Sequence, residues 1–285
     1  MRRVSIIADS TCDLSKELLG RYQIATFPLH IHLGDKEYSD AVDITPEDIY
    51  KWSDLNKETP KTSAISLAEA EEYIERALAK APQVICFCIS GDMSSCGDVM
   101  NMAAAELEKE DSVFVIDSQN LSTGIGLQII EAAIMAENGM DAKEIVDNIT
   151  KLQPKVRASF VVDTLTYLHR GGRCSGLAAM AGGALKMHPY IHVVDGKMLP
   201  GKKYRGKMEK VVHDYVEDLK PELLKARPER VFITHSGSEE SIVAAVKAQL
   251  EELHYFTEIL ITRAGSVVSS HCGPGTLGVL FISGE

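Results

Sequence analysis

The stretch Phe160-Val-Val-Asp-Thr-Leu-Thr-Tyr-Leu-His-Arg-Gly-Gly-Arg173 carries more information about the fold than any other part of the sequence. Its apolar start predicts the end of a strand, and Leu165–Arg170 predicts a short helix. Gly171-Gly172 then predicts a tight turn that ends on Arg173. The residues before this stretch and those after it follow two different patterns.

The residues before it alternate between strand and helix. Strands are expected at Val4–Ala8, Ile24–Leu33, Val84–Ser90 and Val113–Asp117, with helices at Leu14–Tyr22, Pro46–Trp52, Leu67–Ala79, Asp98–Glu108 and Gly126–Ala136. Nearly continuous apolar strands separated by helices are typical of a parallel sheet that is covered on both faces. The sequence therefore predicts an N-terminal α/β/α sandwich with a mainly parallel sheet over residues 1–156.

The residues after it mix a hairpin with two long helices. The hairpin is expected at Tyr190–Leu199, with Asp195-Gly196 at its turn. Such a mixture predicts a C-terminal two-layer α/β sandwich with a mixed sheet over residues 157–285. The other expected strands are Ala158–Val162, Arg230–Thr234, Glu258–Thr262, Val267–Ser269 and Leu277–Ile282, and the expected helices are Leu177–Lys186, Lys207–Lys225 and Glu239–Leu253.

Length and composition are those of a globular protein. A chain of 285 residues with 45% hydrophobic and 25% charged residues is long enough for two domains. It has no run of 18 apolar residues, so no membrane-spanning helix is expected. The apolar run before Asp9 is too short for the core of a signal peptide, so we expect a cytoplasmic location.

Charge and cysteine spacing exclude further classes. The net charge of −11 argues against nucleic-acid binding, because such a surface repels phosphates. No pair of cysteines has the Cys-x-x-Cys spacing of a zinc site, so we expect no metal, no cofactor and reduced thiols. The six cysteines are Cys12, Cys86, Cys88, Cys96, Cys174 and Cys272.

Two hydroxyl-rich segments precede predicted helices. Thr62-Ser63 lies just before a capping box made by Ser66 and Glu69, and Ser94-Ser95 follows a buried strand and opens the next helix with Asp98. Two such loops at helix N-termini, beyond the ends of parallel strands, are suited to bind an anion. Each loop taken alone is more typical of ordinary helix capping.

Aspartates and a histidine are further candidates. Asp9 and Asp117 each end a predicted strand, where an Asp-Ser pair more often satisfies backbone amides of its own loop than acts as a catalytic acid. His271 stands beside a Gly-Pro-Gly turn, where it either donates a hydrogen bond to an anion or belongs to a surface turn. Ser94 with His271 would supply a nucleophile and a base, but no third group is evident, and both the Gly-x-Ser-x-Gly elbow and the Walker A loop are absent.

Together these segments resemble the DegV family over essentially the whole chain. The opening Asp-Ser-x-x-Asp-Leu, the Thr-Ser loop, the central signature and the final His-x-Gly-Pro-Gly occur in the family's order. The matching segments are Asp9–Leu14, Thr62-Ser63, Ile89–Cys96, Phe160–Arg173 with Pro189…Gly196, and His271–Gly275. The third segment departs from the family, because the usual Gly-Thr is Ser95-Cys96 here.

The resemblance implies a cytoplasmic lipid-binding protein that is not itself an enzyme. It encloses a long-chain fatty acid such as palmitate in a tunnel between the domains. It presents the acid to a fatty acid kinase for phospholipid metabolism, as a monomer with transient membrane contact. Thr62, Ser94 and His271 would bind the carboxylate, with Ser63 and Ser95 as further candidates; Arg173 would lie on the surface that meets the kinase. The alternatives are a Ser/His acyl hydrolase or transferase and a small-anion sensor.

Overall fold

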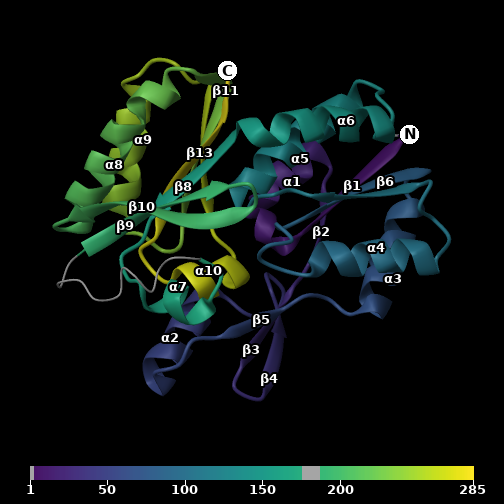
Figure 1. Cartoon of the computed structure of the whole chain (residues 1–285), viewed down its shortest axis with the longest axis horizontal. Helices are drawn as coiled ribbons and strands as arrows, with labels where there is room; N and C mark the ends of the chain where they lie inside the picture. Colours follow the sequence, from purple (N-terminus) through teal and green to yellow (C-terminus); the bar gives the residue numbers. More distant parts are fainter. Residues whose placement is uncertain (1–2, 175–186) are drawn as a thin grey trace.

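The computed structural model describes residues 3–174 and 187–285. Figure 1 shows a four-stranded sheet with its helices on one side of the molecule and a six-stranded sheet with its helices on the other. Together they form the α/β fold that the sequence predicted, one sheet parallel and the other mixed. The expected helix Leu177–Lys186 lies outside the described residues.

The four-stranded sheet has the order β2-β1-β6-β7 and is parallel throughout. Helices α3 and α4 pack together on one face, and α5 and α6 pack on the other, with α1 beside α5. The predicted α/β/α sandwich is confirmed. The elements are β1 Val4–Asp9, β2 Ala25–Phe27, β6 Gln83–Cys88, β7 Val113–Asp117, α1 Lys16–Tyr22, α3 Leu67–Leu78, α4 Cys96–Glu106, α5 Thr123–Glu137 and α6 Ala142–Leu152, with short 3-10 helices at η1 Ser10–Cys12 and η2 Gln153–Lys155.

The prediction of a single strand at Ile24–Leu33 is wrong. The chain forms β2 in the parallel sheet and then β3 in a separate three-stranded antiparallel sheet of order β4-β3-β5. Pro28 stands between the two strands, and a proline has no N–H to continue a ladder. The elements of this region are β3 His30–Leu33, β4 Lys36–Ser39, β5 Lys61–Ser63 and α2 Pro46–Asn56.

The six-stranded sheet has the order β10-β9-β8-β13-β11-β12, in which only the β11–β12 pair is parallel. Helices α8 and α9 cover one face, and the other face meets α5. The predicted two-layer sandwich with a mixed sheet and its hairpin turn at Asp195-Gly196 are confirmed. The elements are β8 Val156–Val161, α7 Thr166–Gly171, β9 Met187–Val194, β10 Lys197–Arg205, α8 Met208–Leu223, β11 Ala226–His235, α9 Glu240–Glu251, β12 Glu258–Arg263 and β13 Leu277–Ser283.

The strand expected at Val267–Ser269 is also wrong, because these residues belong to helix α10, Ser266–Cys272. The helix packs against α2, α7, β3 and β5. Carboxylates from distant parts of the chain accept hydrogen bonds from its first N–H groups, which local sequence cannot reveal.

One apolar core runs through both halves of the molecule. It includes Ile6 and Ile85 of the parallel sheet and Phe160, Phe232 and Leu280 of the mixed sheet. A second core fills the space between α8, α9 and the mixed sheet. The strands of the parallel sheet end at residue 117 and those of the mixed sheet begin at residue 156. A division into domains at residues 156 and 157 stays a prediction.

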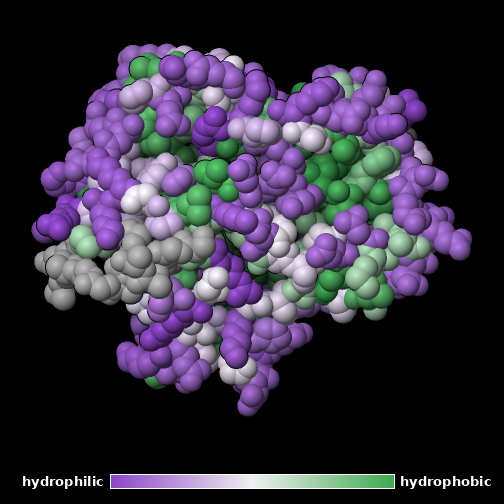
Figure 2. Space-filling model, in the orientation of Figure 1, coloured by the Kyte–Doolittle hydropathy of each residue, from purple (hydrophilic) through white to green (hydrophobic). Residues whose placement is uncertain are grey.

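Polar side chains cover most of the face seen in Figure 2, and apolar residues reach it mainly in hollows at the middle and over the β1–β6 region. Among the helices of the described residues, none combines the length and apolar character needed to cross a membrane.

Candidate functional site

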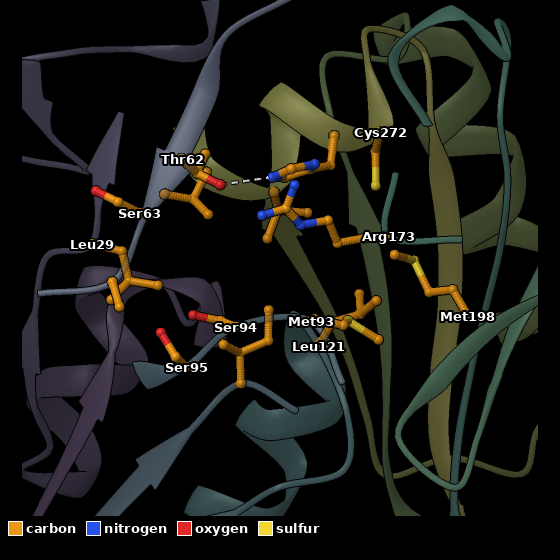
Figure 3. Close-up of a pocket in the computed structure, with 15 residues that line it drawn as sticks. Leu29, Thr62, Ser63, Met93, Ser94, Ser95, Leu121, Arg173, Met198 and Cys272 are labelled. Carbon is orange, nitrogen blue, oxygen red and sulfur yellow. Dashed lines mark hydrogen bonds between the residues drawn. The ribbon is translucent and has the colours of Figure 1, made fainter. Parts of the chain in front are cut away.

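A cavity of about 220 Å³ lies where β5, α10 and the loop after β6 meet. Figure 3 shows these elements around it. All six residues singled out from the sequence as ligand or partner contacts line this cavity. The lining residues are Leu29, Thr62, Ser63, Ala64, Ile89, Met93, Ser94, Ser95, Leu121, Arg173, Met198, Val267, Val268, His271 and Cys272.

Thr62 and His271 form a hydrogen-bonded pair on one wall. Thr62 Oγ1 lies 2.8 Å from His271 Nε2, although the two residues are 209 positions apart in the chain. Burial of the ring, with a smaller contribution from the positive charge of Arg173, lowers the pKa of His271 to about 4. The imidazole is therefore neutral near pH 7, with a proton on only one of its nitrogens.

The other ring nitrogen of His271 faces helix α7. Its Nδ1 is buried and has no hydrogen-bond partner. A Cβ atom added at Gly171 would lie 2.5 Å from this nitrogen, so only glycine leaves room for the ring. From the sequence, Gly171 is predicted only to form a turn, because nothing local shows that a ring packs against it.

The loop after β6 carries Ser94 and Ser95. Ser94 is half-buried and its Oγ accepts a hydrogen bond of 3.3 Å from Cys96 N, while Ser95 is exposed. Ser95 is the N-cap residue of α4, as predicted, but its side chain makes no capping hydrogen bond. Ser90 holds the loop in place by donating 2.7 Å to the carbonyl of Gly196 in the β9–β10 turn.

Thr62 and Ser63 lie on strand β5 and not in a helix-capping turn. Successive side chains of a strand point to opposite faces, so the two hydroxyls diverge. Ser63 Oγ pairs with His32 Nε2 at 2.9 Å, away from the Thr62–His271 pair. The capping box of Ser66 and Glu69 is confirmed at the start of α3.

Arg173 places a positive charge at the cavity. In Figure 3 its side chain extends between Thr62 on one side and Met93 and Ser94 on the other. The residue is exposed, and its Nη1 donates 2.7 Å to the carbonyl of Gly171. Within residues 3–174 and 187–285, none of the ion pairs formed involves Arg173. It is the one arginine or lysine among the lining residues described above.

Asp9, before the first loop, accepts hydrogen bonds from the backbone. Asp9 accepts hydrogen bonds from Thr11 N at 2.9 Å and Ile89 N at 2.6 Å, and burial raises its pKa to about 6. Its carboxylate lies within 4.8 Å of the thiols of Cys88 and Cys96, an arrangement with ligand types that could hold a metal ion. Both Asp9 oxygens already accept hydrogen bonds, which favours the structural role that the sequence predicted.

A serine nucleophile lacks its usual support here. Ser94 and His271 line the same cavity, but His271 Nε2 is paired with Thr62. In the described parts of the chain no carboxylate contacts His271 Nδ1, so the third group of a triad is missing there. The geometry thus favours binding of an anion over acyl transfer.

Comparison with known proteins shows the same family along the whole chain. The family model described as "Uncharacterised protein, DegV family" matches residues 3–284. A DegV domain-containing protein of Deinococcus radiodurans is 33% identical over 277 residues, which cover 97% of each chain.

Solved structures of other proteins share this fold. A DegV family protein from Thermus thermophilus, described by its fatty acid binding, matches with a TM-score of 0.90 and 28% identity over 99% of both chains. DegV of Bacillus subtilis, described as a fatty acid binding protein, matches with a TM-score of 0.85 and 25% identity over 99% of this chain and 100% of its own. The chain belongs to the DegV family.

Proposed function

We propose that this protein binds a long-chain fatty acid and holds its carboxylate between Thr62, Ser94 and His271. The observation that carries the proposal is the cavity in which a hydrogen-bonded Thr–His pair, a serine and an arginine meet among apolar side chains. Its similarity to DegV proteins described as fatty acid binding supports the choice of ligand.

The head group would meet hydroxyl donors and one positive charge. A neutral His271 that donates from Nε2 to Thr62 Oγ1 leaves the Thr62 hydroxyl free to donate to a carboxylate oxygen. Ser94 offers a second hydroxyl, and its half-buried position favours it over the exposed Ser95. Ser63 remains a weaker candidate, since its hydroxyl is paired with His32.

The acyl chain would extend into apolar surroundings between the two sheets. A second cavity of about 30 Å³ shares Leu121, Val268 and Cys272 with the first and reaches Phe160 and Leu280 of the mixed sheet. Each buried methylene contributes about 0.8 kcal/mol, so a chain of roughly sixteen carbons would contribute on the order of 10 kcal/mol. The tail would therefore provide the affinity and the head-group contacts the orientation.

Presentation to a fatty acid kinase is the second part of the proposal. Arg173 is exposed at the rim of the cavity, where a partner could reach both it and the carboxylate. The protein itself would be a cytoplasmic monomer that carries fatty acids for phospholipid metabolism. It would take up its ligand by transient contact with a membrane. Cys12, Cys86, Cys88, Cys96 and Cys272 form no disulfide, which supports a reducing compartment.

Titration of the delipidated protein with matched ligands tests this function. We expect palmitate to bind and hexadecanol, which has the same chain without the carboxylate, to bind at least about tenfold more weakly. Equal binding of the two would contradict a carboxylate site. Equal binding of acetate and palmitate would instead indicate a small-anion sensor.

A further inference from the structure

Two buried aspartates from the first 40 residues hold the start of helix α10. Asp13 Oδ1 accepts a hydrogen bond of 2.8 Å from Gly265 N, and Asp40 Oδ1 accepts one of 2.7 Å from Ser266 N. Asp40 also accepts from the N–H of Val267. Three successive N–H groups at the start of the helix are thus bound by side chains that lie more than 220 positions earlier in the chain.

The helix cannot provide these hydrogen bonds for itself. Its N-cap residue is Gly265, which has no side chain to accept from the first turn. Carboxyl oxygens are well suited to this position, because they accept hydrogen bonds from N–H groups that have no partner within the helix. The fit is close: a Cβ atom on Gly265 would lie 3.1 Å from Asp40 Oδ2 and 3.3 Å from Asp13 Oδ1.

The other end of α10 carries His271. The helix has seven residues, and Val267, Val268, His271 and Cys272 all line the cavity. A shift or rotation at its start would therefore change where the imidazole lies with respect to Thr62.

Asp40 also connects α10 to the opposite wall. Its Oδ2 accepts a hydrogen bond of 2.9 Å from Ser10 Oγ. The same Ser10 oxygen accepts a hydrogen bond of 3.2 Å from the N–H of Leu29, which lines the cavity. Asp13 Oδ2 accepts 2.5 Å from Ser122 Oγ, next to the lining residue Leu121. The two aspartates thus fix three walls of the cavity relative to one another.

We infer that Asp13 and Asp40 are positioning residues, which set the place of His271 in the cavity by holding the start of α10. Only the expected effect on fatty-acid binding rests on the proposed function; the effect on the position of His271 does not. It gives the Asp-Ser-x-x-Asp segment a role in the site, although neither aspartate lines the cavity.

Spectra of [¹⁵N]histidine-labelled full-length protein test the inference without any ligand. We expect Asp40→Ala to shift or broaden the ring ¹⁵N signals of His271, identified with His271→Ala, and to weaken oleate binding at least about fivefold. Asp141→Ala is the matched control. It removes an aspartate cap from α6, a helix with no residue in the cavity wall, and should change neither quantity.

A second variant covers the case in which Asp40→Ala does not fold. Gly265→Ala keeps both carboxylates and pushes the helix away from them, and it should give the same changes in the His271 signals and in binding. Unchanged His271 signals in either folded variant would overturn the inference. If wild-type protein binds no oleate while the His271 signals still move in the variants, the proposed function fails and the positioning role stands.

Discussion

The imidazole of His271 carries no charge near neutral pH, because burial and the nearby Arg173 lower its pKa to about 4. Its hydrogen bond with Thr62 therefore joins two neutral groups, and the positive charge at the cavity resides on Arg173. At the scale of single residues the site thus separates two tasks. In the proposed function, the Thr62–His271 pair would orient the carboxylate and Arg173 would supply the positive charge.

Thr62→Val removes the hydroxyl while it keeps the shape of the side chain. It leaves His271 Nε2 without its partner and removes a donor from the head-group site. We expect fatty-acid binding to weaken by about 1–2 kcal/mol, or roughly five- to thirtyfold, in calorimetric titration with palmitate. Thr26→Val, on the edge strand β2 and outside the cavity, is the control. Equal affinity of wild type and Thr62→Val would remove Thr62 from the site.

Arg173→Gln removes the charge at the rim. We expect palmitate affinity to fall by about two- to fivefold at 0.1 M salt, because an exposed charge is strongly screened. The affinity of the wild type should decrease as salt is added, and that of the variant should change less. Arg170→Gln is the matched control, since Arg170 donates to the carbonyl of Lys57 and does not line the cavity.

The expected effect of Arg173→Gln on presentation of the bound acid to a kinase is larger than its effect on binding. Arg173→Gln should impair phosphorylation of the bound acid by a fatty acid kinase more than it impairs binding, and Arg170→Gln should preserve the cavity. If both arginine variants bind palmitate with the affinity and salt dependence of the wild type, Arg173 makes no charge contact with the ligand.

Polar site residues could be selected from the sequence, but the apolar ones could not. Thr62, Ser94 and His271 stand in short segments with hydroxyl, glycine or turn patterns, and the structure places all three at one cavity. Leu121 and Met198 line the same cavity, but from the sequence they cannot be distinguished from ordinary core residues. Burial against a ligand and burial against protein select the same side chains. Carboxylate binding by the polar residues stays a prediction.

At the scale of elements, the structure contains two helices, α6 and α10, that the sequence analysis did not predict, each for a different reason. The helix α6 was not expected, although its buried Ala142, Ile145 and Ile149 follow the helical spacing and Asp141 caps it, so the signal was present. Helix α10 is a different case. Its valines favour a strand, and the groups that stabilise its first turn come from Asp13 and Asp40. No local pattern could reveal them.

The link between η1, α5 and α10 through Asp13 predicts a pH dependence. Burial raises the pKa of Asp13 from 3.8 to about 8, so the folded protein keeps a proton that the unfolded chain releases. The resulting contribution to stability is complete below the ordinary pKa of 3.8 and is lost as the pH rises through about 8. Asp13→Asn keeps an acceptor for Gly265 N and has no proton to lose.

We therefore expect the free energy of unfolding of Asp13→Asn to rise relative to that of the wild type as the pH is raised. The difference should change by roughly 1 kcal/mol per pH unit between pH 5 and about 8. Urea unfolding at several pH values measures this difference. Repulsion from Asp40 and Asp9 contributes to the raised pKa of Asp13, so the comparison includes their interaction with it. Parallel pH profiles of the two proteins would show that Asp13 is not protonated in the folded state.

At the scale of the whole molecule, apolar and polar contacts join the two halves. The apolar core continues from one sheet to the other through α5. At its edge Glu131 of α5 pairs with the buried Arg230 of β11 at 2.5 Å. Tyr50 of α2 donates 2.8 Å to the carbonyl of Ser236, after β11. A ligand that fills the cavity would contact both halves and would stabilise the folded chain as a unit.

Fatty-acid binding is tested most directly by mass spectrometry of the protein as purified from a bacterial host, under native and then denaturing conditions. We expect a native mass above that of the chain by one fatty acid, and release of a single long-chain acid per protein on denaturation. A native mass equal to that of the bare chain, unchanged after incubation with palmitate and oleate, would contradict fatty-acid binding.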